Sequence, residues 1–305
     1  MKSPRFDIVA MGEAMVEFNQ EQPGSPQYLQ GFGGDTSNAV IAAARAGARC
    51  AYVSAVGDDH FGQLLMDLWH QARVDTAQVA IESGASTGLY FVHHQAHGHE
   101  FTYRRSNSAA STTKLHPGQI QTIEHAAWFH YSGISQAISS IAREQCETAV
   151  HAAREAGVKI SYDSNLRLKL WSLEAARAPM LAAIASCDLF LPSYDDITAL
   201  SGLSDPQAIL AWSHDLGAAR VALKLGDGGV MISDGLQTHT LAPLRVSLVD
   251  ATGAGDCFAG NLLARLSLGD DFVNAARYAN AAAALSVTGR GAVAPLPYPL
   301  AVEQA

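Results

Sequence analysis

Positive charge is scarce in this chain. It has 20 Lys and Arg against 29 Asp and Glu, a formal net charge of −9, and no dense basic run. Proteins that bind polyanions grip the phosphates with clustered Lys and Arg. A nucleic-acid-binding function is therefore not expected. A single phosphate group remains a possible ligand, because backbone N–H groups at a helix N-terminus bind anions without net positive charge.

Paired cysteines and long apolar runs are missing as well. Cys50, Cys146, Cys187 and Cys257 are scattered and form no CxxC pair, which excludes the usual zinc-ribbon and redox motifs. In a chain of 305 residues they are expected to be reduced, mostly buried thiols. No stretch of 18 apolar residues is present, and Asp7 interrupts the only candidate for a signal peptide. We expect a cytoplasmic protein with no membrane partner.

Two familiar nucleotide motifs are also missing. No glycine-rich loop ends in the Lys-Ser/Thr pair of a Walker A motif, and no GxGxxG follows the first strand, so a nicotinamide enzyme is not expected. Hydrophobic residues make up 48% of the chain and charged residues 16%, which is enough to bury a large core. The length suits a single α/β domain over residues 1–305.

What is present is a regular alternation of apolar strands and amphipathic helices. Near-continuous apolar strands that alternate with helices predict a doubly wound, mainly parallel sheet with helices on both faces. The expected strands are 6–13, 50–56, 127–132, 158–163, 189–192 and 220–225. The expected helices are 38–46, 61–71, 138–156, 173–185, 206–216, 255–268 and 275–287.

One region breaks this alternation. Residues 87–93 and 100–105 are β-rich and are joined by the turn-like 95–98, which predicts a hairpin. With the polar segment 14–34, it predicts a small β lid formed from about 14–34 and 86–110. Four histidines lie on the hairpin, but no Cys or carboxylate spacing supports a zinc site, and exposed loop residues are the better interpretation. They are His93, His94, His97 and His99.

The strongest chemical signal is the run Gly253-Ala254-Gly255-Asp256. Its small residues let the backbone approach a ligand, and the N–H groups of the following helix would face that ligand. Such an anion hole suits the charge that develops on a transferring phosphoryl group. An aspartate at this point can accept the proton of an attacking hydroxyl. Taken alone, the run could also be an ordinary glycine turn.

A second glycine motif lies about 200 residues earlier in the chain. Gly33-Gly34-Asp35-Thr36-Ser37-Asn38 precedes the first long helix, and Gly57-Asp58-Asp59 follows further on. Together with the C-terminal run, these segments resemble the ribokinase-like (PfkB) family of carbohydrate kinases over nearly the whole chain. The resemblance implies an ATP-dependent sugar kinase with a ribokinase-like fold, which uses ATP and Mg²⁺ and forms a homodimer through its lid.

The resemblance also assigns roles to residues. It implies that Asp256 is the general base, that Gly253, Ala254 and Gly255 form the anion hole, and that Gly33, Gly34 and Asn38 bind the sugar. Lys224, Gly226 and Gly229 would border the nucleotide, as would Asn165 and Asn280, although Asn280 could equally be an ordinary polar residue of its helix. The segment 287–292 resembles a loop that holds K⁺ through backbone carbonyls in many members.

Two features narrow the substrate. Strand alternation places Phe101, Tyr103 and Arg105 on one face of the hairpin. Arg binds carboxylates through a bidentate fork, and Arg167 follows a strand whose C-terminal end faces the ligand crevice. With Tyr90, this set resembles the 2-keto-3-deoxygluconate kinase subgroup, so we expect a sugar acid as substrate.

The sequence departs from the family at one site. Many members have Asn-x-x-Glu near residue 193, whereas this chain has Ser193 and Asp196. A contact from Asp196 to Mg²⁺ would be mediated by water, as is usual for this ion. The alternatives that stay open are a fructokinase, a ribokinase, a 2-keto-3-deoxygalactonate kinase, or a non-catalytic sugar or nucleotide sensor on the same fold.

Overall fold

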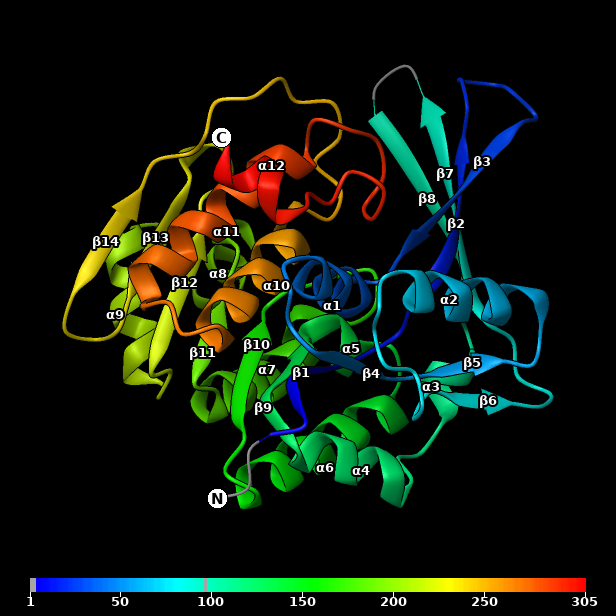
Figure 1. Ribbon diagram of the computed structural model, residues 1–305, viewed down its shortest axis with the longest axis horizontal. Coiled ribbons are helices and arrows are strands. Elements are labelled where there is room, and N and C mark those ends of the chain that lie inside the picture. The colour runs from blue at the N-terminus through cyan, green and yellow to red at the C-terminus, as the bar shows by residue number, and fades with distance from the viewer. Residues whose placement is uncertain (1–3, 96–97) are drawn as a thin grey trace.

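An eight-stranded sheet forms the centre of the computed structural model, which describes residues 4–95 and 98–305. The strand order is β14-β13-β12-β11-β10-β9-β1-β4, and the pairs from β4 to β12 are parallel, whereas β13 and β14 are antiparallel. The strands are β1 (Phe6–Met11), β4 (Cys50–Val53), β9 (Ala126–Ser132), β10 (Lys159–Asp163), β11 (Leu189–Leu191), β12 (Arg220–Lys224), β13 (Val230–Ser233) and β14 (Thr238–Leu241). The predicted mainly parallel sheet is confirmed (Figure 1).

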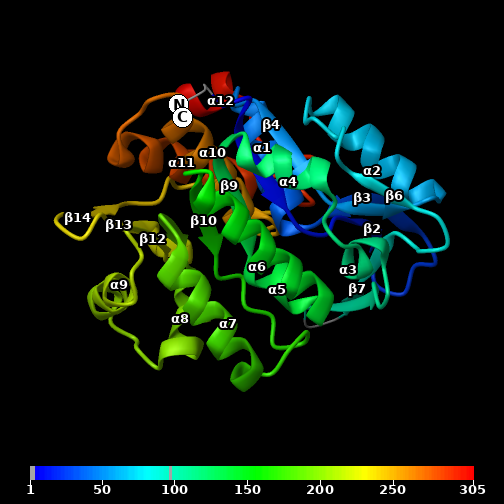
Figure 2. The same cartoon turned by 90° about the horizontal axis from the view of Figure 1, so that it is seen from below.

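Helices cover both faces of this sheet because its strands are apolar on both sides. In β1, Ile8 and Ala10 pack into one core and Val9 packs into the other. The first core is covered by α1 (Asp35–Arg45), α10 (Ala254–Ser267) and α11 (Phe272–Ser286), with α2 (His60–Gln71) and α12 (Pro299–Glu303) beside them. The second core is covered by the row seen from below in Figure 2, which comprises α4 (Pro117–Glu124), α6 (Ser140–Glu155), α7 (Leu173–Ser186), α8 (Tyr194–Ser201) and α9 (Pro206–Asp215).

A second, four-stranded sheet projects from one side of the molecule (Figure 1). Its order is β3-β2-β7-β8, so two hairpins from distant parts of the chain meet where β2 pairs with β7 in parallel. The predicted hairpin and small separate sheet are confirmed, except that residues 96–97, and with them His97, lie outside the described residues. The strands are β2 (Met15–Gln20), β3 (Tyr28–Gly33), β7 (Gly88–Gln95) and β8 (Gly98–Arg104).

Several expected elements differ in extent: α1 and α11 each begin three residues earlier than expected, and β1 ends at Met11 rather than at 13. The strand expected over 50–56 breaks into β4 and β5 (Ala55–Gly57), because the Ser54 hydroxyl donates to the Gly12 carbonyl and β5 pairs with β6 (Ala80–Glu82). The helix expected from residue 138 begins at α6, where Ser139 caps it by accepting from the Ala142 amide. Residues 133–137 form the separate short α5 (Gly133–Ala137), and α3 (Ala109–Thr112) was not expected.

All four cysteines are buried and free. No described helix combines the length and the apolar character needed to span a bilayer. The described His, Cys, Asp and Glu side chains form no group of three that could hold a metal ion, and His93 and His94 instead contact Tyr28 and Asn19.

Candidate active site

The run 253–256 forms the start of α10. Gly253 is the residue before the helix and has a φ of 77°, in the left-handed region that favours glycine. A side chain at Gly253 would meet Ala292, at 2.9 Å from its Cβ. Asp256 lies in the first turn, where backbone N–H groups have no partner within the helix. The loop and helix start expected of an anion hole are therefore present.

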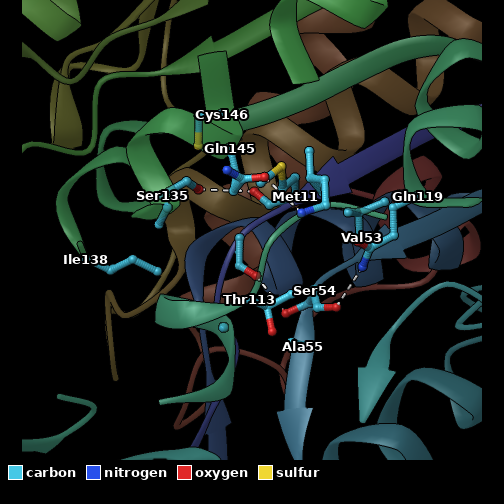
Figure 3. Close-up of a pocket in the computed structure, with 14 residues that line it drawn as sticks. Met11, Val53, Ser54, Ala55, Thr113, Gln119, Ser135, Ile138, Gln145 and Cys146 are labelled. Atoms are coloured by element: carbon cyan, nitrogen blue, oxygen red, sulfur yellow. Dashed lines mark hydrogen bonds between the residues drawn. The ribbon is translucent and has the colours of Figure 1, made fainter. Parts of the chain in front are cut away.

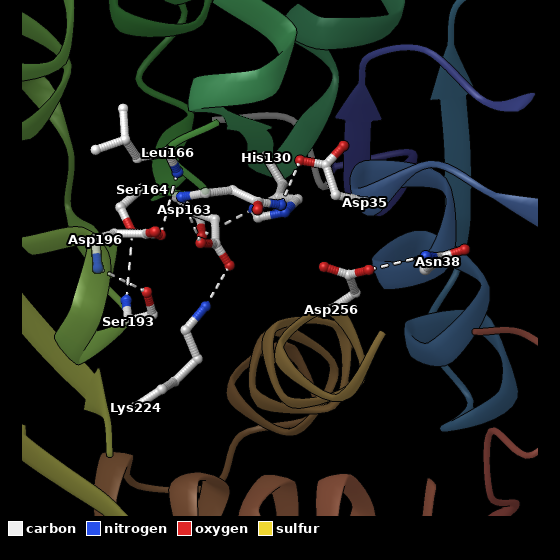
Figure 4. A network of polar contacts seen from close by, with 12 residues as sticks. Asp35, Asn38, His130, Asp163, Ser164, Leu166, Ser193, Asp196, Lys224 and Asp256 are labelled. Atoms are coloured by element: carbon white, nitrogen blue, oxygen red, sulfur yellow. Dashed lines mark hydrogen bonds and ion pairs between the residues drawn. The ribbon is translucent and has the colours of Figure 1, made fainter. Parts of the chain in front are cut away.

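The two glycine motifs meet at Asp256. The side-chain amide of Asn38, on the first turn of α1, donates a hydrogen bond to Asp256 Oδ2 at 2.8 Å (Figure 4). This contact depends on close packing of α1 against α10. Gly260, one turn after Asp256, lies directly against the carbonyl oxygen of Ala39, and a methyl group there would also lie 2.9 Å from the Ala42 Cβ. Glycine at 260 thus lets the helices approach far enough for Asn38 to reach the carboxylate.

The surroundings of Asp256 make it a strong base. Burial and the nearby charge of Asp35 raise the pKa of Asp256 to about 8, while the hydrogen bond from Asn38 opposes the rise. Efficient general bases have a pKa near the operating pH, so this value suits proton removal from a hydroxyl group.

Asp35 is a residue of this site that the sequence did not single out. It is the first residue of α1 and is only 9% exposed. Its Oδ2 accepts a hydrogen bond from Asn165 Nδ2 at 2.9 Å, whereas Oδ1 is buried without a hydrogen-bond partner among the described residues. A buried unpaired acceptor is costly unless a ligand satisfies it. Asp35 Oδ1 is therefore suited to accept a hydroxyl of the sugar.

Lys224 supplies a positive charge beside the anion hole. Its Nζ lies 2.6 Å from Asp163 Oδ2, and both side chains are largely buried. A Cβ on Gly255 would lie 3.4 Å from the same Nζ, so glycine at 255 keeps the ammonium group next to the first turn of α10. Lys224 is thus placed to attract a phosphate that approaches this turn, as expected of a residue bordering the nucleotide.

Asp196 holds the loop that carries Arg167. Its Oδ2 accepts from the Ser164 hydroxyl at 2.9 Å and from the Leu166 amide at 3.1 Å, and its Oδ1 lies 4.0 Å from Arg167 Nη1. The described carboxylates do not converge into a protein cage for a metal. Mg²⁺ needs no such cage, since it keeps several waters and is carried by the nucleotide's phosphates with one or two carboxylates. Asp196 and Asp163 fit that limited role.

The aromatic residues of the lid face Gly33. The ring of Tyr90 lies against Gly33, and its hydroxyl donates a short hydrogen bond to Glu17, which is 4% exposed. Tyr103 stacks on Tyr90 with ring centroids 5.9 Å apart, and Phe101 stacks on Tyr103. The expected shared face of Phe101 and Tyr103 is confirmed. Burial raises the pKa of Tyr103.

Arg105 lies just beyond the end of β8, where the chain turns towards Ser108. The expected continuation of the strand to Arg105 is therefore wrong by one residue. Its Nη2 forms a buried ion pair with Glu13 Oε2. Both Arg105 and Arg167 oppose the rise in the pKa of Tyr103 caused by burial, so both charges lie within electrostatic reach of that phenol.

The remaining residues predicted to border the nucleotide lie on and after η1 and on α11. The turn η1 (Gly226–Gly228) joins β12 to β13, and Gly226 and Gly229 have φ values of 62° and 86°. The Asn280 amide, on α11, donates to the Ala242 carbonyl at 2.7 Å. None of these contacts tests a role in ATP binding, which stays a prediction.

The C-terminal loop lies against the loop that precedes the anion hole. The carbonyl of Val287 accepts from the amides of Val249 and Asp250 at 2.8 and 3.1 Å. The Gly291 amide donates to Asp250 Oδ2 at 2.9 Å. The two loops that the resemblance connects with K⁺ are therefore in contact, and K⁺ binding itself stays a prediction.

A family model described as pfkB family carbohydrate kinase matches residues 5–299. The chain belongs to the pfkB family of carbohydrate kinases. It is 34% identical to a 2-dehydro-3-deoxygluconokinase of Thermoproteus tenax, with 98% of this chain and 94% of the relative covered. It is also 34% identical to fructokinase-1 of Zea mays, with 97% and 96% covered.

Solved structures show the same fold. A putative ribokinase II from E. coli in complex with ATP and Mg²⁺ superposes with a TM-score of 0.90 at 26% identity, with 98% of each chain covered. The ribokinase-like fold is thereby confirmed. This pfkB kinase is an ATP-dependent sugar kinase, and its relatives of equal identity act on different sugars.

A small cavity lies away from these residues. It has a volume of about 30 Å³ and is lined by residues of β1, β4 and the helices α3 to α6, among them Ser54, Gln119 and Gln145 (Figure 3). This volume holds one or two waters. None of the residues predicted for the site lines it, so it belongs to the packing of the pfkB kinase.

Four buried carboxylates of the pfkB kinase, those of Glu13, Glu17, Asp35 and Asp163, were not predicted as site residues from the sequence. Asp35 could have been found, because an acidic residue directly after Gly34 at the start of an alanine-rich helix has no structural need for burial there. Glu13 and Asp163 follow strand ends, where α/β sheets place their ligands. Their partners Arg105 and Lys224 are 92 and 61 residues away, by the residue numbers, and only the tertiary structure pairs them.

Proposed function

We propose that this kinase transfers the γ-phosphoryl group of ATP to the terminal hydroxyl of 2-keto-3-deoxygluconate, giving 2-keto-3-deoxy-6-phosphogluconate and ADP. The observation that carries the proposal is the pair of guanidinium groups, Arg105 and Arg167, whose charges both reach the Tyr103 phenol. Arg is the side chain best suited to a carboxylate. A sugar acid would present its carboxylate to these groups and its terminal hydroxyl to Asp256.

In the proposed reaction, Asp256 accepts the proton of the attacking hydroxyl. The hydroxyl oxygen forms a bond to the γ-phosphorus, and the bond from that phosphorus to the β,γ-bridging oxygen breaks, so the electron pair leaves with ADP. The backbone N–H groups of residues 253–255 and the Lys224 ammonium stabilise the transferring group. Mg²⁺, when bound with ATP, neutralises charge on the phosphates, with Asp196 as its protein partner through water.

The remaining predicted contacts complete the proposed site. Gly33, Gly34, Asn38, Tyr90 and Tyr103 bind the sugar, and Asp35 accepts one of its hydroxyl hydrogens. ATP is bordered by Asn165, Lys224, Gly226, Gly229, Gly253, Gly255 and Asn280. The Asn165 amide donates to Asp35 Oδ2, so Asn165 contacts a proposed sugar-binding residue as well.

A substrate panel with a coupled ADP assay tests the proposal. We expect the highest kcat/KM with 2-keto-3-deoxygluconate, compared with its galactonate-type epimer, fructose and ribose. Equal or better turnover of fructose or ribose would overturn the acid substrate. No turnover of any sugar would favour a binding protein without catalysis.

The carboxylate contact has its own test within the panel. Arg105→Ala should raise KM for the acid and hardly change KM for a neutral sugar. Arg104→Ala is the matched control. Arg104 is exposed and, as the residue after Tyr103 on β8, faces the opposite side of the sheet from Tyr103. If KM rises equally for the acid and for neutral sugars, Arg105 does not bind the substrate carboxylate.

A neutral-sugar kinase is the second candidate, and one observation favours it. Glu13 neutralises Arg105, while the carboxylates of Glu17 and Asp35 are acceptors suited to hydroxyl groups. The chain is as similar in sequence to a fructokinase as to a 2-dehydro-3-deoxygluconokinase, 34% identical to each, which agrees with this alternative. The same substrate panel separates the two candidates.

We also propose that the kinase forms a homodimer through its lid. Leu29, Phe101 and Tyr103 are 53%, 36% and 39% exposed on that sheet. Apolar lid surface of this kind is costly in water and is covered when two lids pair. Sedimentation of the protein as a monomer at micromolar concentration would contradict the dimer.

A further inference from the structure

The small sheet is attached to the core by four chain crossings, and one residue lies next to all of them through its backbone or its side chain. The chain enters the sheet between β1 and β2, leaves it between β3 and α1, re-enters it between β6 and β7, and leaves again between β8 and α3. Glu13 forms part of the first crossing. It is 1% exposed, although a carboxylate is rarely buried without a function or a partner.

The other three crossings lie against Glu13. A methyl group on Gly34 would lie 2.6 Å from the Glu13 carbonyl oxygen, and one on Gly88 would lie 2.8 Å from Glu13 Oε1. The Ser108 hydroxyl donates a short hydrogen bond to Oε1, and Arg105 forms its ion pair with Oε2. A residue that merely filled space here would need no charge. The negative charge of Glu13 pairs with the guanidinium of Arg105.

Glu13 does not satisfy all the hydrogen-bond donors of Arg105. Its side chain is 11% exposed, and its Nε has no hydrogen-bond partner among the described residues. A buried guanidinium needs its donors satisfied, and a planar fork bound on one side leaves donors free for a second acceptor. The unused donor lies on the same group whose charge reaches Tyr103 at the proposed sugar site.

We propose that Glu13 is a positioning residue for the kinase reaction: it fixes Arg105 for the substrate and links that arginine to the crossings on which the lid is mounted. The substrate part of this inference rests on the proposed sugar-acid function. Without the carboxylate, Arg105 would be a buried cation with no fixed partner and would move towards solvent, away from the substrate.

A double-mutant cycle tests the inference. The proteins are wild type, Glu13→Gln, Arg105→Gln and the double variant, each assayed for KM and kcat on the acid and on fructose, with a thermal melt. Glu13→Gln should raise KM for the acid about tenfold or more, because removing one partner of a buried ion pair costs at least that much. In the Arg105→Gln background the same change should leave KM unaltered.

The outcomes separate this inference from the proposed function. If wild type prefers fructose, the acid substrate is wrong, whatever the cycle shows. If wild type prefers the acid but the two KM effects multiply as independent changes, Glu13 does not act through Arg105 and the inference fails. A fall in melting temperature with unchanged KM would also overturn it, since a purely structural ion pair gives that result.

A milder variant covers the case in which Glu13→Gln does not fold. Ser108→Ala removes only the hydroxyl that donates to Glu13 and leaves the charges in place. It should raise KM for the acid about threefold with Arg105 present and not with Arg105→Gln, in keeping with the loss of one hydrogen bond. Equal rises in both backgrounds would overturn the inference. Glu100→Gln, on the exposed part of the same hairpin, is the matched control and should leave KM unchanged.

Discussion

Asn38 Nδ2 lies 2.8 Å from Asp256 Oδ2, although the two residues are 218 positions apart in the chain. The contact joins the first turns of α1 and α10, so each glycine motif supplies one half of it. Because the amide donates to the carboxylate, it orients the base and favours its charged form. The predictions below concern this pair and its neighbours.

Asp256→Asn should reduce kcat by about 10²- to 10⁴-fold, the range that a positioned general base contributes. Binding of ATP and sugar should stay nearly unchanged, because Asn keeps the size of the side chain and an oxygen for Asn38. Calorimetric titration of both ligands and the coupled ADP assay measure the two effects. If kcat of the variant stays within tenfold of wild type, Asp256 is not the general base.

The same substitution should stabilise the unliganded protein in a pH-dependent way. The folded-state pKa of Asp256, about 8, is above its ordinary value of 3.8, so the folded protein binds this proton more tightly than the unfolded chain does. That stabilisation is complete below pH 3.8 and is lost as the pH rises to about 8. Asn carries no such proton. Melting temperatures of wild type and variant should therefore agree near pH 4, and the variant should melt increasingly higher as the pH approaches 8.

Asp35→Asn should shift the pH dependence of the reaction. The charge of Asp35 is, after burial, the largest contribution that raises the pKa of Asp256. Removing it should lower the pH at which kcat/KM reaches half of its maximum, and should raise KM through loss of the acceptor at Oδ1. Profiles of kcat/KM against pH measure the shift, with the exposed Asp195→Asn as control. An unchanged midpoint would show that Asp35 does not act on the base.

Gly260→Ala should lower both stability and kcat. The new methyl group would press on the Ala39 carbonyl and lie 2.9 Å from the Ala42 Cβ, and overpacking of this kind costs about 1–3 kcal/mol. Relief of the clash separates α1 from α10, which lengthens the contact between Asn38 and Asp256. Urea unfolding and steady-state kinetics test both effects. Ser267→Ala, on the last turn of α10, is the control, and equal behaviour of the two variants would contradict the packing argument.

The sequence predicted those parts of the molecule that depend on local patterns. Apolar periodicity located the core strands and most helices, and Gly253 marked the start of α10, because a left-handed residue before a helix favours glycine. The hairpin at 88–104 followed from its β-rich segments and turn. Each of these signals lies within about twenty residues of the chain.

Pairings between distant residues could not be predicted in this way. Nothing near Arg105 in the chain shows that its charge is met by Glu13, and nothing near Lys224 shows that Asp163 is its partner. The break at Ser54 likewise depends on the carbonyl of Gly12, which directly follows β1. Arg105 is present at the lid as expected, but the carboxylate of Glu13 offsets its positive charge, which the sequence around Arg105 does not show.

The small sheet is built wholly from two insertions in the N-terminal third of the chain, between β1 and α1 and between β6 and α3. The groups proposed for phosphoryl transfer, from Asp163 to Asp256, come from the later two thirds. Of the proposed sugar contacts, Gly33, Gly34, Tyr90, Tyr103 and Arg105 belong to these insertions, so mutations there would change the sugar site more directly than the transfer chemistry. This division would allow substrate specificity to change through substitutions in the insertions. It agrees with the equal identity, 34%, to relatives that are named for different sugars.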